Sequence, residues 1–339
     1  MSSERWERTK EILEQALRLA SQERRAYLDS ACGADADLRR EVESLIASHE
    51  EAGSQFLGAA GPEVLGLAPA RTLTSGTKLG SYEIIDLLGA GGMGEVYRAR
   101  DARLDRVVAI KILPAAFSAD SDRLYRFEQE ARSASALNHP NIVTIYELGK
   151  QGPIHYIAME MIEGKTLREL LVSGSLPIRK TIEIAAQVAE GLAKAHESGI
   201  SHRDLKPENL MVSHDGFVKI LDFGLARLAS PTAHGSDMCT TSQTPPGQVL
   251  GTVGYMSPEQ ASGGRLDFRS DQFSFGLVLY EMVTRQRAFQ RSTAAETMVA
   301  ILREQAEPIG LRNRDAPAPL CWAIERCMTK DPDKRYVST

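Results

Sequence analysis

The sequence predicts an α+β protein in which the strands gather in one stretch and helices precede and follow them. Three short segments of strand character, Tyr82 to Leu88, Glu95 to Arg100 and Val107 to Lys111, succeed one another with only turns between them. Apolar residues then recur at helical spacing from residue 126 to 138. The same spacing occurs within residues 1 to 55, so we expect a small all-α segment ahead of the strands.

This N-terminal segment is predicted to form three short amphipathic helices. Its 12 acidic and 8 basic residues give a net charge of −4, most of the chain's −5, so a basic nucleic-acid footprint is absent. We expect a packing or spacing module there, with dimerisation or partner docking as the alternative. Residues 56 to 80 are rich in Ala, Gly and Pro and predict a flexible linker. Residues 81 to 339 then form the main domain.

Composition indicates how many folding units the chain can form and in which compartment it is expected. The 339 residues are 42% hydrophobic and 25% charged, enough for two or three folding units with a substantial core. Four cysteines show no metal-ligand spacing and are expected to be reduced thiols. No segment approaches the roughly 18 apolar residues that a bilayer-spanning helix needs, and the N-terminus lacks signal-peptide character. We therefore expect a cytoplasmic protein.

A glycine-rich string, Gly89 to Gly94, separates the first two predicted strands. Glycines allow backbone amides to approach phosphate oxygens closely. The pattern G-x-G-x-x-G also occurs in dinucleotide-binding units, where it opens a helix. Here Val96 and Tyr97 continue as a strand, which favours a phosphate-binding hairpin over a dinucleotide-binding unit.

Two further strings carry the chemistry. Ile200 to Asn209 reads Ile-Ser-His-Arg-Asp-Leu-Lys-Pro-Glu-Asn, and Asp222 begins Asp-Phe-Gly thirteen residues later. Each triplet alone is an ordinary capped turn or strand end. Their order and separation, together with a predicted strand from Phe217 to Leu221 that leads into Asp222, favour a joint catalytic motif over two chance matches.

Jointly these strings resemble the eukaryotic-like Ser/Thr protein kinases of bacteria, and the resemblance covers residues 81 to 339, about three quarters of the chain. It implies a bilobal fold, with a small strand-rich lobe carrying one helix at 81 to 158 and a larger, mostly helical lobe from about 165. It also implies a non-specific serine/threonine protein kinase that acts in signal transduction. ATP and Mg²⁺ would be its cofactors and protein Ser/Thr hydroxyls its acceptors.

The resemblance also assigns roles to single residues. Asp204 would receive the proton of the acceptor hydroxyl, and Lys206 would bridge Asp204 and the transferring phosphate. Asn209 and Asp222 would hold Mg²⁺, and Lys111 would contact the α- and β-phosphates. The alternative for Lys111 is a solvated lysine on an edge strand.

A carboxylate on the following helix should orient Lys111, and the sequence offers Glu128 and Glu130. We assign the ion pair to Glu130 by resemblance and keep Glu128 as the alternative.

Nucleotide contacts are implied along the first lobe and the connection between the lobes. Met159 would be the gatekeeper, with the backbone of Glu160 and Met161 bonded to adenine. The remaining contacts would be Leu88, Gly89, Ala90, Gly91, Gly92, Met93, Gly94, Val96, Ala109 and Met211. Leu88, Val96, Ala109 and Met211, which would sandwich the adenine ring, could equally be plain core.

Between Gly224 and Gly251 the chain shows no periodicity, and composition alone favours a disordered polar loop. Because Arg203 precedes the catalytic Asp, we expect it to pair with a phosphorylated residue of this loop, and autophosphorylation is the expected source. The candidate phosphosites are Thr240, Thr241, Ser242 and Thr244.

Three further residues are expected to be structural. Glu259, in a string where the kinase pattern usually has Ala in place of Ser257, should form a buried pair with Arg335. Asp271 should cap the backbone of the catalytic loop.

Two rival functions are less consistent with the strings. A pseudokinase would have lost Lys111, Asp204 or Asp222, and a small-molecule phosphotransferase would resemble His-Gly-Asp at the loop. The chain stops at Thr339, where the last helix of such a domain would begin, so we expect the natural protein to continue. Membrane anchoring by such an extension is the alternative to a purely cytoplasmic protein.

Overall fold

The computed structural model describes residues 73–91, 94–114, 121–223 and 253–339, together with Tyr27, Leu28, Ala31, Cys32 and Arg39. The chain divides into two units, residues 1–72 and 73–339. The five described residues of the first unit are all helical. The rest of the predicted three-helix segment lies outside the described residues, as does the predicted linker up to residue 72.

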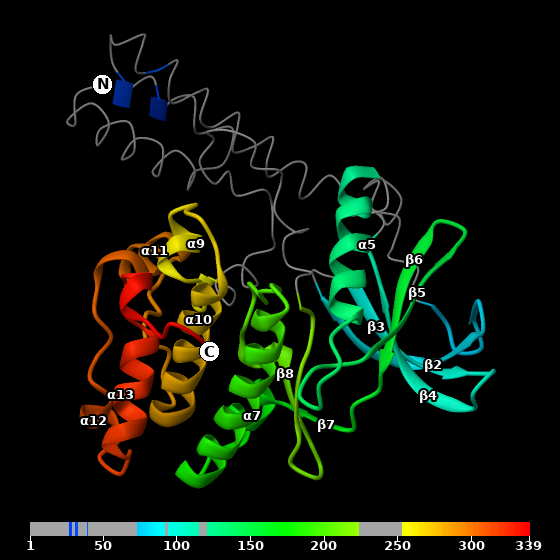
Figure 1. The fold of residues 1–339 in the computed structure, drawn as a ribbon. Coiled ribbons are helices and arrows are strands. Elements are labelled where there is room, and N and C mark those ends of the chain that lie inside the picture. Colours follow the sequence, from blue (N-terminus) through cyan, green and yellow to red (C-terminus); the bar gives the residue numbers. More distant parts are fainter. Residues whose placement is uncertain are drawn as a thin grey trace. The chain divides into compact units, whose positions relative to one another are not determined.

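Within the described residues, an antiparallel sheet of six strands opens the second unit, in the order β1-β2-β3-β4-β6-β5 (Figure 1). Neighbours in the chain are mostly neighbours in the sheet, so short turns suffice to build it. The strands are β1 (Lys78–Leu79), β2 (Tyr82–Gly91), β3 (Gly94–Asp101), β4 (Arg106–Ile112), β5 (Ile145–Gln151) and β6 (Ile154–Glu160). The three predicted strands correspond to β2, β3 and β4, and each is confirmed.

Strand alternation divides this sheet into two faces, each with its own core. On β4, Val108 and Ile110 join one cluster, whereas Ala109 belongs to a second cluster that includes residues of helix α5 (Ser121–Ser135). Since side chains alternate along a strand, Lys111 shares the α5 face with Ala109. The apolar residues that recur at helical spacing in and after α5 are buried: Phe127, Ala131, Ala134 and Leu137.

The second unit begins at Leu73, ahead of residue 81, where the sequence predicts the domain to start. The reason is local pairing: β1 is antiparallel to β2, and the Leu73 N–H donates to Tyr97 Oη at 2.9 Å. Leu73 also packs against the cluster that contains Tyr97. Composition alone could not separate this short strand from the preceding segment.

Helices dominate the remainder of the unit, around the long helix α10 (Figure 1). α10 is buried along its length and contacts α7, α9, α12 and α13. A small sheet, β7-β8-β9, lies beside them. The elements are β7 (Gly164–Thr166), α6 (Leu167–Ser173), α7 (Ile178–Glu197), η1 (Pro207–Asn209), β8 (Leu210–Ser213), β9 (Val218–Ile220), α9 (Pro258–Ala261), α10 (Phe268–Thr284), α11 (Ala294–Arg303), α12 (Ile309–Arg312), α13 (Ala318–Cys327) and η3 (Pro332–Lys334).

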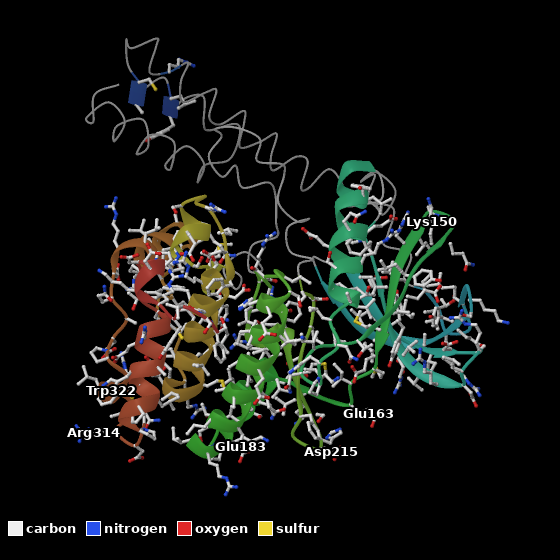
Figure 2. All side chains as sticks on the ribbon, in the orientation of Figure 1. Lys150, Glu163, Glu183, Asp215, Arg314 and Trp322 are labelled. Atoms are coloured by element: carbon white, nitrogen blue, oxygen red, sulfur yellow. The ribbon has the colours of Figure 1, made fainter. Side chains whose placement is uncertain are left out.

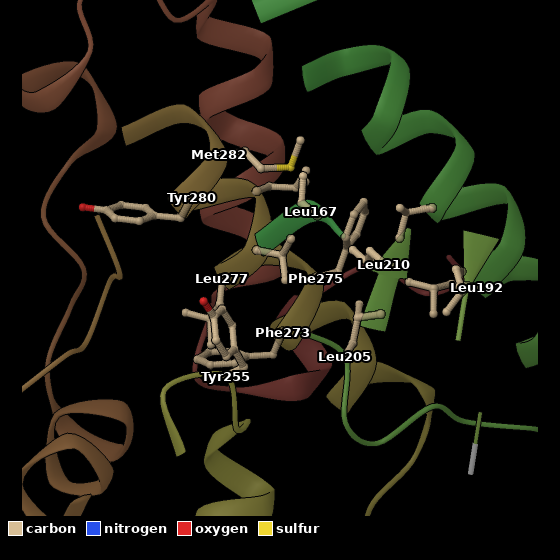
Figure 3. Close-up of a cluster of buried hydrophobic side chains, with 14 of the residues drawn as sticks. Leu167, Leu192, Leu205, Leu210, Tyr255, Phe273, Phe275, Leu277, Tyr280 and Met282 are labelled. Carbon is tan, nitrogen blue, oxygen red and sulfur yellow. The ribbon is translucent and has the colours of Figure 1, made fainter. Parts of the chain in front are cut away.

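The core of this helical part reaches into the connection that carries the predicted catalytic residues. Figure 3 shows Leu205 within the cluster, together with Leu210 and Phe273. Leu205 is fully buried. Because burial of a leucine side chain is worth about 1.5–3 kcal/mol, Leu205 anchors the polar residues on either side of it.

Polar side chains such as Glu183 and Arg314 lie at the outside of this part (Figure 2). Among the described residues, no helix is both long and apolar enough to cross a membrane.

Candidate active site

The connection from α7 to η1 is held by hydrogen bonds to its backbone. Asp271, near the start of α10, accepts from the N–H groups of His202 and Arg203, both at 2.7 Å. Arg203 has φ = 67°, a left-handed conformation that costs a non-glycine residue roughly 1–2 kcal/mol. The predicted capping role of Asp271 is confirmed, and its two bonds help to stabilise this strained turn.

His202 ties the connection to the segment that carries Asp222. Its Nε2 donates to the carbonyl oxygen of Leu221 at 2.7 Å, and its Nδ1 accepts from the Asp204 N–H at 3.2 Å. These partners fix the neutral tautomer with the proton on Nε2. The ring also lies edge-on to Phe223, with centroids 4.9 Å apart. Two strings distant in sequence are thereby brought together.

Two polar side chains, those of Lys206 and Asn209, meet at Asp204. Lys206 Nζ donates to Asp204 Oδ2 at 2.7 Å, and Asn209 Nδ2 donates to the Asp204 carbonyl oxygen at 2.8 Å and to Oδ2 at 3.2 Å. The side chains of Asp204 and Lys206 are only 10% and 14% exposed. Because the amide nitrogen of Asn209 is engaged here, the geometry orients its oxygen Oδ1 away from Asp204.

Asp222 and Lys111 form an ion pair across the two parts of the unit, with Nζ and Oδ2 2.7 Å apart. Lys111 is 9% exposed at its side chain, which excludes the solvated edge-strand lysine considered from sequence. Asp222 is thus a carboxylate partner of Lys111 in this structure. Glu130 lies on α5, on the same face of the sheet. The pairing of Lys111 with Glu130 stays a prediction.

The glycine-rich string forms the predicted hairpin. β2 and β3 pair up to Gly91 and Gly94, and the intervening Gly92 and Met93 lie outside the described residues. At Gly94 (φ = 111°) a Cβ would lie 1.9 Å from the Ile112 carbonyl oxygen, so glycine is required there. The string therefore approaches the strand that bears Lys111.

The predicted adenine contacts fall into different surroundings. Ala109 and Met159 are buried in one cluster, against which Val96 and Met161 pack. Leu88 is 45% exposed at the end of β2, consistent with a surface open to a ligand. Gly89 and Ala90 pair with Val96 and Glu95 across the hairpin, and Met211 lies on β8.

Both the backbone N–H and the carboxylate of Glu160 have partners within the protein. Its N–H donates to the Thr144 carbonyl oxygen at 2.9 Å, and its carboxylate bonds Lys219 Nζ at 2.8 Å. The Glu160 N–H is thus engaged within the protein in this conformation.

Glu259 and Arg335 form the predicted buried pair. Arg335 is fully buried at its side chain, and two of its nitrogens bond the two carboxylate oxygens of Glu259, at 2.7 and 3.0 Å. Burial opposes ionisation of Glu259, but the bonds from Arg335 outweigh it and hold the pKa of Glu259 below its ordinary value. The pair fixes the start of α9 to the residue that follows η3.

Sequence reasoning missed Gln260, whose Nε2 donates to the Arg203 carbonyl oxygen at 2.6 Å. A local signal was present, because Ser257 and Gln260 fit the S-x-x-Q capping box, and both of its bonds form. The four predicted phosphosites, together with Gly224, lie outside the described residues.

Comparisons with known proteins agree with this geometry. The protein kinase domain family matches residues 82–339. The serine/threonine-protein kinase PknB of Mycobacterium leprae is 40% identical over 260 residues, which cover 75% of this chain and 40% of PknB. A probable serine/threonine-protein kinase of Clostridium perfringens is 41% identical over 256 residues, covering 75% of this chain and 36% of that protein.

The crystal structure of the Mycobacterium tuberculosis PknI kinase domain superposes with a TM-score of 0.61 at 25% identity, covering 78% of this chain and 95% of PknI's. The chain spans about two fifths of the length of the curated relatives it matches. Its second unit has the bilobal α+β architecture of these kinases. The chain belongs to the protein kinase family.

Proposed function

We propose that this protein is an ATP-dependent serine/threonine protein kinase that transfers the γ-phosphate of ATP to Ser or Thr hydroxyls of proteins. The observation that carries the proposal is the convergence of Asp204, Lys206 and Asn209 with the Lys111–Asp222 pair, through the bonds of His202. This set supplies a carboxylate for the acceptor, two ammonium groups for phosphate charge and oxygen ligands for a cation.

The residues fit Mg²⁺. Asn209 presents an amide oxygen because its nitrogen is bonded to Asp204, and Asp222 presents a carboxylate whose other oxygen meets Lys111. Carboxylate and amide oxygens are the protein ligands that suit this cation. When bound with ATP, Mg²⁺ would neutralise charge on the phosphates.

The chain's own groups would perform the remaining steps. Asp204 orients the acceptor hydroxyl and takes its proton, while Lys206 holds the Asp204 carboxylate and stabilises negative charge on the transferring group. Lys111 and the string from Gly89 to Gly94 hold the phosphates. The apolar residues around Met159 would receive the adenine ring.

We propose that nucleotide binding exchanges the partner of Lys111. Asp222 cannot give its full charge to a cation while it neutralises Lys111 at 2.7 Å. Glu130 of α5 would supply that neutralisation instead, since α5 packs on the face of the sheet that bears Lys111. Asp222 would then be released to the cation.

We also retain the proposal that the segment around Thr240, Thr241, Ser242 and Thr244 is phosphorylated and then pairs with Arg203. Arg203 Nε is buried and has no hydrogen-bond partner among the described residues. A phosphate adds about −1.5 to −2 charge at neutral pH, enough for strong bonds to a guanidinium. Mass spectrometry of active protein should find phosphate there, and replacing all four residues by Ala should lower activity without unfolding. A fully active, unmodified protein would contradict this proposal.

For cellular context, we propose a cytoplasmic catalytic unit. Among the described residues, Cys321 and Cys327 are free thiols, as is usual in a reducing compartment. Burial raises the pKa of Cys327 to about 11, so this thiol is expected to be unreactive. Dimerisation through residues 1 to 55 is retained as a proposal beside the spacing role.

The experiment incubates the purified chain with Mg²⁺, labelled ATP and a generic basic protein, and identifies the labelled amino acid. We expect phosphoserine and phosphothreonine, and their loss in Asp222→Asn. Asp215→Asn is the matched control, because Asp215 is an exposed carboxylate on the turn between β8 and β9 (Figure 2). Absence of transfer by the parent chain, or label confined to tyrosine, would overturn the proposal.

A further inference from the structure

The peptide between Arg203 and Asp204 sets the direction of the proposed catalytic carboxylate. The orientation of this peptide plane sets the φ angle of Asp204 and so helps to determine where its side chain points. Arg203 has φ = 67°, so this plane is not held by the conformational preference of the residue itself. Other groups must hold it.

Hydrogen bonds occupy both polar ends of this peptide. The Asp204 N–H donates to His202 Nδ1 at 3.2 Å, and the Arg203 carbonyl oxygen accepts from Gln260 Nε2 at 2.6 Å. The preceding N–H groups, of His202 and Arg203, are bonded to Asp271. Of the two partners of the Arg203–Asp204 peptide, His202 belongs to the same connection and Gln260 comes from α9.

The amide of Gln260 is itself oriented. Its Oε1 accepts from the Ser257 N–H at 2.8 Å, and its own N–H donates to Ser257 Oγ at 3.2 Å, which together cap α9. Ser257 is fully buried. With the oxygen held by the cap, the NH₂ group is directed toward Arg203.

The capping box needs only the oxygen of residue 260. A glutamate would serve the cap equally well, since Glu and Gln both occur at this position of a capping box. It would, however, place carboxylate oxygen against the Arg203 carbonyl oxygen, two acceptors without a proton between them. The cap therefore does not require the NH₂ group of Gln260, which instead donates to the Arg203 carbonyl oxygen in the catalytic loop.

We propose that Gln260 is a positioning residue for Asp204: its amide locks the Arg203–Asp204 peptide and couples the start of α9 to the catalytic loop. This inference rests on the proposed role of Asp204. A displacement of α9 would therefore alter the orientation of Asp204, the proposed base, through the hydrogen bond from Gln260 to Arg203.

The test compares Gln260→Glu, Gln260→Met and Ser257→Ala with the parent chain, using kcat, the KM for ATP and the thermal midpoint. Gln260→Glu keeps the cap oxygen and loses the donor. Ser257→Ala loses the hydroxyl of the cap, while the backbone N–H of residue 257 still holds Gln260 Oε1. We expect both Gln260 variants to lose at least about tenfold in kcat, with the KM for ATP within about twofold. Ser257→Ala should stay within about threefold of the parent kcat.

A purely structural role would give a different pattern. If Gln260→Glu retained the parent kcat, or if Ser257→Ala lost as much as Gln260→Glu, the inference would be overturned. Should Gln260→Met fail to fold, Gln260→Glu carries the test because its cap is complete. Asp204→Asn is assayed in the same series: a variant as active as the parent would overturn the role of Asp204, and the inference with it.

Discussion

Replacing Glu259 by Gln should lower the free energy of unfolding of the second unit by about 3 kcal/mol, because it leaves the guanidinium of Arg335 buried without a counter-charge. Arg335 is fully buried, and its other bonds go to three neutral carbonyl oxygens, those of Thr329, Arg269 and Lys330. Among the residues that the structure describes, Ser270 is the further side-chain partner of Glu259, at 2.8 Å. Each residue thus depends on the other for charge compensation.

A double-mutant cycle measures this dependence by urea unfolding of the full chain. Breaking a buried pair typically costs 3–5 kcal/mol, whereas removing both charges often costs little, so Glu259→Gln with Arg335→Met should cost at least about 2 kcal/mol less than the sum of the single changes. A loss below about 1 kcal/mol for Glu259→Gln, or additive single changes, would refute the reasoning.

The stabilisation by the Glu259–Arg335 pair should depend on pH, and the pKa of Glu259 gives the sign of this dependence. The pKa of Glu259 is lower in the folded protein than its ordinary value, so the unfolded chain binds the proton more tightly. The stabilisation is therefore present above the ordinary glutamate pKa of about 4.3 and is lost as the pH falls through the lower, folded value. The difference between parent and Glu259→Gln should shrink across that window.

Three further predictions concern the first sheet, the nucleotide loop and the helical part. Lys111→Met and Glu130→Gln should each reduce kcat strongly and the double change should cost far less than their product; strictly multiplicative losses in steady-state kinetics would point to Glu128 instead. Gly94→Ala should destabilise the unit in urea and raise the KM for ATP, because its Cβ would overlap the Ile112 carbonyl, whereas Gly89→Ala, whose Cβ meets nothing within 4 Å, should leave the urea midpoint near that of the parent. Burial, then Arg335, lower the pKa of Lys330 to about 8, so the unfolded chain binds more protons between pH 8 and 10.5, and stability should rise with pH there. Relative to Lys330→Met, the parent should gain on the order of 1–2 kcal/mol between pH 7.5 and 9.5; no gain would contradict the burial of a charged Lys330.

The sequence was most informative where structure is local. The strand from Arg106 to Ile112 and the hairpin closed by Gly91 and Gly94 could be predicted, because alternation and glycine placement act over a few residues. The strings around Asp204 and Asp222 were recognised by order and spacing, and the bond from His202 to Leu221 gives the physical reason for that order.

The choice among distant partners could not be predicted from spacing. Lys111 meets Asp222, 111 positions along the chain, and no spacing rule pointed to this partner. The same limit applies to Gln260. Its capping box with Ser257 is readable from sequence, but its bond to Arg203 spans 57 positions and depends on how α9 packs. The sequence pattern therefore predicts the capping box but not the bond from Gln260 to Arg203.

The central claim, that Asp204 acts on the acceptor in the phosphoryl-transfer step, is tested most directly by two measurements on Asp204→Asn: the affinity for ATP with Mg²⁺ and the single-turnover rate of transfer. Asparagine keeps the shape of the side chain and removes its charge, so the proposed nucleotide contacts at Lys111 and the glycine string should persist. We predict an affinity within about threefold of the parent and a transfer rate lower by about 10²–10⁴-fold. A transfer rate equal to that of the parent would contradict the claim.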